Sequence, residues 1–437
     1  KETKNSKKVV ICALSPLKIL CLPFYQQPKV FINTYLYRAD SEKRWHQHLL
    51  STKWNLVMLS YGLAFLLRSL LYTISGGPYT LFDGYFWSVH RLVKHNHFIG
   101  AVFASYSVNY IVVDYLLYLA PNRFSAVAMK ELLIDLTCPL RWWDRVHSVW
   151  WGTLPPLLLP KLSLNHFRHL SAAQQQKCAL FRQMITPPVA AYCAMRSYTA
   201  IFAFWVIFIN FFQHRPGLNY YSATVFALDM SLNLAYIRRT FLNMFYSVLH
   251  FATVTFALYI GSTEAARTFK QILVLKRSGS CSPFAQKMIH SAEAFRRQHS
   301  KLLIDLITFD ARFASLFIFS SILPVVVGDI YNGSVLVFEK HDSKVDFYLV
   351  LSGIVFQSLK LLLLQYLPAV SEALYGGQQA LYDCQLKVKG HLRDKIKLMT
   401  YHELMATQER VTFNAGTFGK ITKKWLLDVN NVLQFYF

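Results

Sequence analysis

Charged side chains are scarce in this sequence. Asp, Glu, Lys and Arg make up 16% of the 437 residues, whereas hydrophobic residues make up 54% and aromatic residues 16%. An ordinary soluble domain carries about 25% charged residues. Several apolar runs also approach the ~20 residues that a helix needs to cross a bilayer core. The composition therefore excludes an ordinary soluble domain and indicates an integral membrane protein.

Alternating strands and a disulfide framework are also missing. No series of short apolar-polar alternations indicates a transmembrane barrel, so we expect the spanning elements to be helices. The seven cysteines lie at positions 12, 21, 138, 178, 193, 281 and 384. Cys193 falls in a predicted membrane span, and the other six fall in segments that we expect on the cytosolic side of the membrane. This placement implies no disulfide framework. We therefore expect an all-α polytopic membrane protein.

Acidic residues are the rarest charged type, with 23 Asp and Glu against 46 Lys and Arg and a formal net charge of +23. A nucleic-acid-binding protein would place such charge on one face of a soluble domain. Basic residues that flank membrane spans explain the excess better, because they set the orientation of the chain. We therefore expect no nucleic-acid partner.

The hydrophobic pattern predicts seven spans. Arg238 and Arg239 split one long apolar stretch, so the fourth span is either 219–237, which we prefer, or 240–260. The other predicted spans are 55–74, 98–120, 188–212, 311–331, 346–367 and a last one within 418–437. The chain thus divides into an N-terminal segment (1–54), a six-span bundle with long cytosolic loops (55–367), cytosolic linker and assembly helices (368–417), and a seventh helix (418–437).

The distribution of basic residues predicts the orientation of the spans. The four segments expected inside carry 35 Lys and Arg, and the three expected outside carry 5. The positive-inside rule then places the N-terminus in the cytosol and, after seven spans, the C-terminus outside. The sequon Asn332-Gly333-Ser334 falls in the predicted third outer loop, where Asn332 can be glycosylated. We expect a multi-pass protein of the plasma membrane.

Sequence patterns of enzymes and metal sites are weak here. His402 and Glu403 resemble the start of a zinc-protease helix, but Ala406 occupies the place of the second ligand. No Gly-rich phosphate loop, nucleophile elbow or Cys-x-x-Cys pair occurs. We expect no catalytic residue, metal or cofactor. The alternative of a polytopic membrane enzyme would depend on Asp114 and Asp229, and His250 could be their partner only if the fourth span is 240–260.

A ligand pocket is expected in the outer half of the bundle. A charge in the bilayer core costs ~2.5 to 3.5 kcal/mol and favours an interior or water-lined position. Arg68, Asp114, Arg196, Asp229 and Lys360 are such charges. Aromatic and polar residues gather in the same spans and would line a mostly apolar pocket, although helix packing and an interfacial aromatic belt explain them as well. The predicted pocket residues are Tyr72, Tyr106, Asn109, Trp205, Tyr221, Asp229, Tyr348 and Phe356.

Four stretches resemble the insect gustatory receptor family, the seven-span chemoreceptors with a cytosolic N-terminus. They are RRTFLNMFYSVL (with Arg239 and Asn243), FRRQHSKLLIDL (with His299 and Leu302), FNAGTFGKIT (Phe413 to Thr422) and the Gln434-Phe435 pair of LQFYF. Their order along the chain matches the family. Leu427 and Asp428 stand where the family carries a Thr-Tyr pair. The last helix, from Ile421, is also short, with about 25 Å for a core of about 30 Å.

The resemblance implies a ligand-gated, non-selective cation channel for small organic tastants. It implies a homotetramer, or a heteromer with related subunits, in contact with membrane lipid. The seventh helices would surround a central pore, lined by Asn431, Gln434 and Phe435, with rings of side chains from the subunits. The alternative within this resemblance is a non-conducting membrane scaffold, which the shortened last helix favours.

Overall fold

The structure is a computed structural model of the whole chain. It describes residues 53–77, 83–92, 96–116, 171–214, 220–274, 282–338, 366–388, 392–407 and 410–425. Over these ranges the regular elements are helices, with one isolated antiparallel bridge between Asn414 and Lys420. The all-α prediction is confirmed for the described ranges.

The helices differ greatly in length. In chain order they are α4 (Lys53–Ser75), α5 (Gly84–Leu92), α6 (Asn96–Asp114), α9 (Ala172–His214), α10 (Tyr220–Val274), α11 (Ser282–Phe309), the π-helical turn η4 (Asp310–Ala314), α12 (Ser315–Phe338), α14 (Tyr366–Tyr375), α15 (Gln378–Lys387), α16 (Leu392–Thr407) and the short 3-10 turn η5 (Gly416–Phe418).

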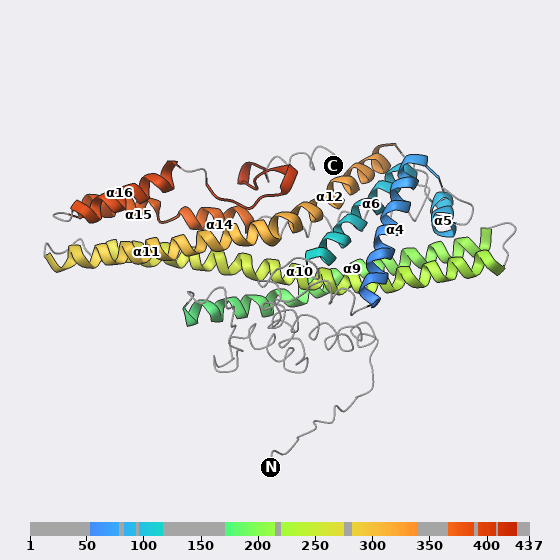
Figure 1. The fold of residues 1–437 in the computed structure, drawn as a ribbon, viewed down its shortest axis with the longest axis horizontal. Helices are drawn as coiled ribbons and strands as arrows, with labels where there is room; N and C mark the ends of the chain where they lie inside the picture. Colours follow the sequence, from blue (N-terminus) through green and yellow to red (C-terminus); the bar gives the residue numbers. More distant parts are fainter. Residues whose placement is uncertain are drawn as a thin grey trace, which may run out of the picture.

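The longest helices connect two groups of shorter ones (Figure 1). α10 runs along the long axis of the molecule, and α11 and α12 together lead back in the opposite direction. At one end, α4, α5 and α6 lie beside the start of α10 and the end of α9. At the other end, α14, α15 and α16 lie along α10 and α11.

Helix α4 shows why an apolar sequence forms a helix with two different faces. Its 23 residues give about 34 Å of helix, enough to cross a bilayer core. Met58, Phe65 and Tyr72 are buried and seven residues apart, so they lie on one side. Leu63 and Leu67 are exposed on another face, so the helix has a packed side and an apolar exposed side.

Within the described ranges, two helical stretches are long and apolar enough to cross a bilayer: Val57–Ser75 and Gln286–Gly328. Ala200–His214 is a shorter apolar helix. Most charged residues of the second stretch precede Leu306, and only Asp310 and Arg312 follow it, so its more apolar part overlaps the predicted fifth span, 311–331.

Helix α10 contains both alternatives for the fourth span. It is 55 residues long and continues unbroken through Arg238 and Arg239. Arginine is a good helix former, and no proline interrupts the segment. Buried residues such as Val248 and Phe251 continue beyond the arginine pair and pack in the main core. The two alternatives for the fourth span, 219–237 and 240–260, therefore belong to one continuous helix from Tyr220 onward.

The segment that resembles the family's lead into the seventh span forms a closed turn. Ala415 N donates to Gly419 O (2.8 Å), and Ile421 N donates to Phe413 O (2.9 Å). Gly416 and Gly419 have φ of +62° and +83°, where a side chain would be strained. The small-residue pattern is therefore a requirement of this turn.

The closed turn is fastened to the junction of α11 and α12. Phe413 is buried and its ring lies 6.2 Å from Phe251 and 6.3 Å from Phe309, measured between centroids. Asn414 N donates to Asp310 Oδ1 at 3.1 Å, at the first residue of η4. Residues that lead toward the predicted seventh helix are thus held by the start of the predicted fifth span.

Several predictions fall outside the described residues. These are most of the N-terminal segment 1–54, most of the predicted sixth span 346–367, and residues 426–437 of the seventh helix. Asn332 lies within the helical backbone of α12, which continues to Phe338.

Candidate functional site

A cavity lies between α4, the start of α5 and the first turns of α10. Its volume is about 400 Å³, within the range of about 300–1,000 Å³ typical of small-molecule sites. The described lining consists of Arg68, Leu71 and Tyr72 from α4, Asp83, Gly84 and Phe86 around the start of α5, and Val225, Phe226, Leu228, Asp229 and Leu232 from α10. We call it the α4–α5–α10 cavity.

Three charged residues of the wall form one ion-paired triad. Arg68 Nη2 lies 2.7 Å from Asp83 Oδ1, and Arg68 Nη1 lies 2.8 Å from Asp229 Oδ1. Arg68 Nε also donates to Asp83 Oδ2 at 3.1 Å, and Nη2 to Asp229 Oδ2 at 3.0 Å. The exposed fraction of the side chain is 26% for Arg68, 12% for Asp83 and 16% for Asp229, so all three are mostly buried. The guanidinium therefore ties three segments together at one point.

Both carboxylates accept a further hydrogen bond from the protein. Phe86 N donates to Asp83 Oδ1 at 3.1 Å, so Asp83 caps the N-terminus of α5, where the helix dipole favours a negative charge. Tyr61 Oη donates to Asp229 Oδ1 at 2.9 Å. Asp83 is thus held in place by α4 and α5, and Asp229 by two side chains of α4.

Aromatic rings make up much of the remaining wall and its backing. Phe226 stacks on Phe211 with 3.8 Å between centroids, and Phe86 packs on Tyr72 at 4.7 Å. Gly84 lies against the stacked pair, and a Cβ there would come within 2.8 Å of Phe211 Cε2 and of Phe226 Cδ2. The start of α5 approaches α9 and α10 this closely only because residue 84 has no side chain.

The structure brings together two of the predicted pocket residues. Tyr72 and Asp229 both line the cavity. Tyr72 is 1% exposed, and its hydroxyl donates to Asn96 Oδ1 at 2.6 Å. Their role in binding stays a prediction.

The other predicted pocket residues lie elsewhere. Tyr106 is half-buried on α6 and stacks on Tyr110, and Asn109 is buried and donates to Ser320 Oγ on α12. Trp205 and Tyr221 are 60% and 65% exposed. Tyr348 and Phe356 lie outside the described residues, as do Asn431, Gln434 and Phe435 of the predicted pore.

Sequence reasoning missed Asp83, Gly84 and Phe86. A signal for Asp83 was present: it follows the Gly76-Gly77-Pro78 break and directly precedes an aromatic segment, which is typical of a helix N-cap. Arg68 was recognised as a charge within a span, and such a charge needs an acidic partner. Which acid approaches it depends on packing, so the pair could not be named.

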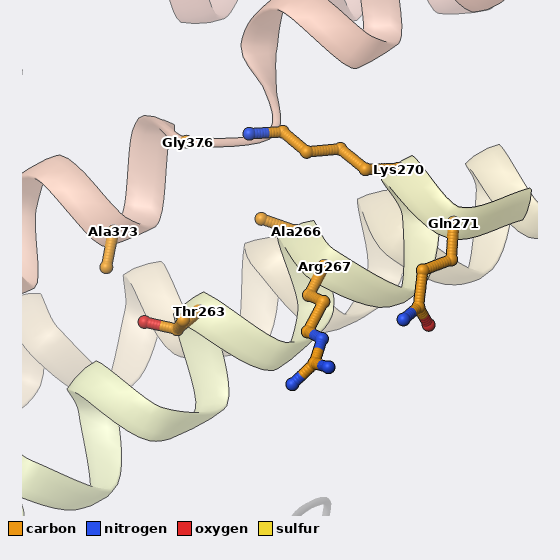
Figure 2. A pocket seen from close by; sticks show the side chains of 7 residues that line it. All are labelled: Thr263, Ala266, Arg267, Lys270, Gln271, Ala373 and Gly376. Atoms are coloured by element: carbon orange, nitrogen blue, oxygen red, sulfur yellow. The ribbon is translucent and has the colours of Figure 1, made fainter. Parts of the chain in front are cut away.

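A second cavity of about 830 Å³ lies between α10 and the end of α14 (Figure 2). Lys270 extends toward the backbone around Gly376, whereas Arg267 and Gln271 point away from it. The remaining described lining residues are Thr263, Ala266 and Ala373. Among the predicted site residues that the structure describes, none lines this second cavity, so it is not our candidate ligand site.

Two histidines that were considered for metal or enzyme chemistry, His402 and His250, lie within the described ranges. These ranges contain no group of three or more His, Cys, Asp or Glu that could hold a metal ion. His402 packs on the ring of Tyr382. His250 is buried against Phe309 and Phe313. Its surroundings are those of a core residue.

The chain was compared with known proteins. No family model and no curated protein matches it. A solved structure of the insect olfactory receptor OR5 from Machilis hrabei, in complex with eugenol, matches 95% of this chain and 97% of its own, with a TM-score of 0.54 at 10% identity. A second structure of the same receptor matches 93% and 95%, with a TM-score of 0.49 at 11% identity. The chain therefore has the fold of the first of these receptor structures over nearly its whole length.

Proposed function

We propose that the chain is a chemosensory receptor that acts as a ligand-gated, non-selective cation channel, and that its small organic ligand binds in the α4–α5–α10 cavity. One observation carries the proposal. In a chain with the fold of an olfactory receptor solved with eugenol, a largely apolar cavity of suitable size contains a fixed group of polar side chains. The sequence likeness to gustatory receptors makes a tastant the expected ligand.

The proposal includes the assembly. The seventh helices of four subunits would surround the pore, with Asn431, Gln434 and Phe435 at the constriction and the helices of 368–417 in the cytosolic part of the assembly. The complex would lie in the plasma membrane, as a homotetramer or a heteromer with related subunits. Ligand would open the channel by binding its open state more tightly than the closed one.

A cavity-filling variant tests the ligand site. The full chain is expressed in cells, and currents are recorded against a panel of sugars, bitter compounds and amino acids. Val225→Trp places a large ring in the cavity and should raise the half-maximal ligand concentration at least about tenfold. Leu67→Trp places the same ring on the exposed face of α4, where Leu67 is 58% exposed, and should leave the response unchanged.

Two outcomes would redirect the proposal. A tetramer that reaches the cell surface and gives no current with the whole panel would support the non-conducting scaffold. Gln434→Ala should alter conductance or ion selectivity, and unchanged currents would remove Gln434 from the pore.

A further inference from the structure

We propose that the α4–α5–α10 cavity selects an organic cation, a protonated amine carried on an aromatic or aliphatic body. This inference rests on the proposed function, because it takes the cavity as the ligand site. It names the chemical class of the ligand.

The described wall of the cavity carries more negative than positive charge. Asp83 and Asp229 bring two negative charges, Arg68 brings one positive charge, and the other described lining residues are uncharged. All three side chains are mostly buried. The described wall therefore carries one net negative charge, in surroundings where an uncompensated charge is costly.

The triad leaves hydrogen-bond acceptor sites of its two carboxylates unused. Arg68 has five N–H donors, and four bonds to the two carboxylates are formed. Asp83 and Asp229 accept three bonds each, whereas a carboxylate offers about four acceptor sites. The wall has little to offer an acidic ligand and still has acceptors for an ammonium group.

The rest of the described cavity wall is mostly apolar. The rings of Tyr72, Phe86 and Phe226 and several leucine side chains surround the triad. A cation is favourable over the face of an aromatic ring, within about 6 Å of its centroid. The Arg68 guanidinium already lies 5.6 Å from the centroid of Phe86. An amine with an apolar body would therefore satisfy both the charged and the apolar parts of the wall.

A metal ion fits the same charge less well. Calcium takes 6–8 oxygen ligands, and here the two carboxylates are already engaged by Arg68. The described residues hold no cluster of three metal-binding side chains. The apolar wall would also leave most of the ion's coordination sites empty.

Matched pairs of amines and alcohols test the inference. We would compare 2-phenylethylamine with 2-phenylethanol, tryptamine with tryptophol, and hexylamine with 1-hexanol. Binding is measured by calorimetry on the purified full-length protein in lipid nanodiscs, and currents are recorded in cells. At least one amine should bind about tenfold or more tightly than its alcohol, a difference of about 1.4 kcal/mol.

Neutralising the wall should remove this preference. Asp229→Asn makes the net charge of the described wall zero with little change of shape, so the amine and its alcohol should bind within about threefold of each other. Asp83→Asn reaches the same charge by a second route, in case one variant fails to fold. Glu264→Gln removes a carboxylate from α10 that pairs with Lys177 outside the cavity, and it should keep the preference.

The outcomes separate this inference from the proposed function. Alcohols that bind as tightly as their amines, or three amines that all fail to bind, would overturn the selection of a cation. If only neutral compounds evoke currents, the proposed channel function is supported and the selection of a cationic ligand is rejected. Amine binding that is lost in Asp229→Asn, in a protein that never conducts, would support the cation and reject the channel.

Discussion

At the scale of single residues, Arg68 is the side chain on which the candidate site depends. Arg68→Gln removes the positive charge between two mostly buried carboxylates. Removing one partner of a buried ion pair costs about 3–5 kcal/mol, and the partial exposure of this triad places the expected loss near the lower end. We expect a clearly lower unfolding temperature for the detergent-solubilised protein. Arg297→Gln is the control: the Arg297 side chain is 73% exposed and pairs with Glu293 on α11, so its loss should change the unfolding temperature little.

His299 offers a test by pH. It lies on α11, before the predicted fifth span, with Nδ1 2.6 Å from Tyr401 Oη. Burial lowers the pKa of His299 to about 4, whereas the ordinary value is about 6.5. Between pH 6.5 and 4 the His299 side chain is therefore protonated in the unfolded chain but stays neutral in the folded protein. The stability linked to His299 is fully present above pH 6.5 and is lost as the pH falls toward 4.

The expected result is a smaller pH effect in a variant. His299→Gln should show a smaller difference in unfolding temperature between pH 7 and pH 5 than the wild type. Comparing variant with wild type cancels the contributions of the other titrating groups. The exposed His290, on the same helix, provides the control His290→Gln. An equal pH effect in wild type and His299→Gln would show that the pKa of His299 is not lowered in the folded protein.

Individual site residues could be predicted only in part. Asp229 and Tyr72 were found because a charge and an aromatic ring in an apolar segment indicate an interior position. Trp205 and Tyr221 carry the same sequence signal, yet they are exposed on the outside of their helices. The spacing of hydrophobic residues and the residue types do not reveal which face of a mostly apolar helix packs against a neighbouring helix. That choice depends on packing partners far away in the sequence.

At the scale of helices, Gly100 controls how closely α4 and α6 approach. A Cβ at residue 100 would lie 2.9 Å from the backbone nitrogen of Thr73 and 3.0 Å from its Cα. Backbone atoms cannot move aside as a flexible side chain can, so Gly100→Ala should push the helices apart. We expect a loss of roughly 1–3 kcal/mol and lower surface expression, measured by labelling of intact cells. Ala101→Ser, at the half-buried neighbouring position, is the matched control.

The existence of most described helices could be predicted, and their ends could not. The apolar runs predicted at 55–74 and 98–120 overlap α4 (Lys53–Ser75) and α6 (Asn96–Asp114). The predicted fourth span is less than half of α10, because hydropathy marks only the part suited to lipid. The continuation of α10 is held by buried residues such as Leu258 and Phe269 against α11 and α14. Such packing is invisible to a hydropathy pattern.

At the scale of the whole molecule, orientation is the prediction to test. An N-terminal tag should become accessible to antibody only after the cells are permeabilised, because the basic segments set the inner side. A glycan at Asn332 would be removed by an amidase and absent in Asn332→Gln. A tag that is accessible on intact cells would overturn the topology. Asn332 lies within a helix, so the tag is the stronger of the two measurements.

The global fold was more predictable than its assembly. Composition, apolar runs and the asymmetry of basic residues indicated a helical membrane protein, and the fold agrees with that of an insect olfactory receptor structure. The number of subunits depends on surfaces that a single sequence does not identify. The residues predicted to line the pore lie outside the described part of the chain.

The unbroken length of α10 has a mechanical consequence. Asp229 on the cavity wall and Gln271 on the groove of Figure 2 belong to the same helix, about 63 Å apart along its axis at 1.5 Å per residue. If α10 tilts as a rigid rod, one degree of tilt about one end of this segment displaces its other end by about 1 Å. A rearrangement too small to reshape the cavity can therefore be amplified into a movement as large as an atom at the far helices.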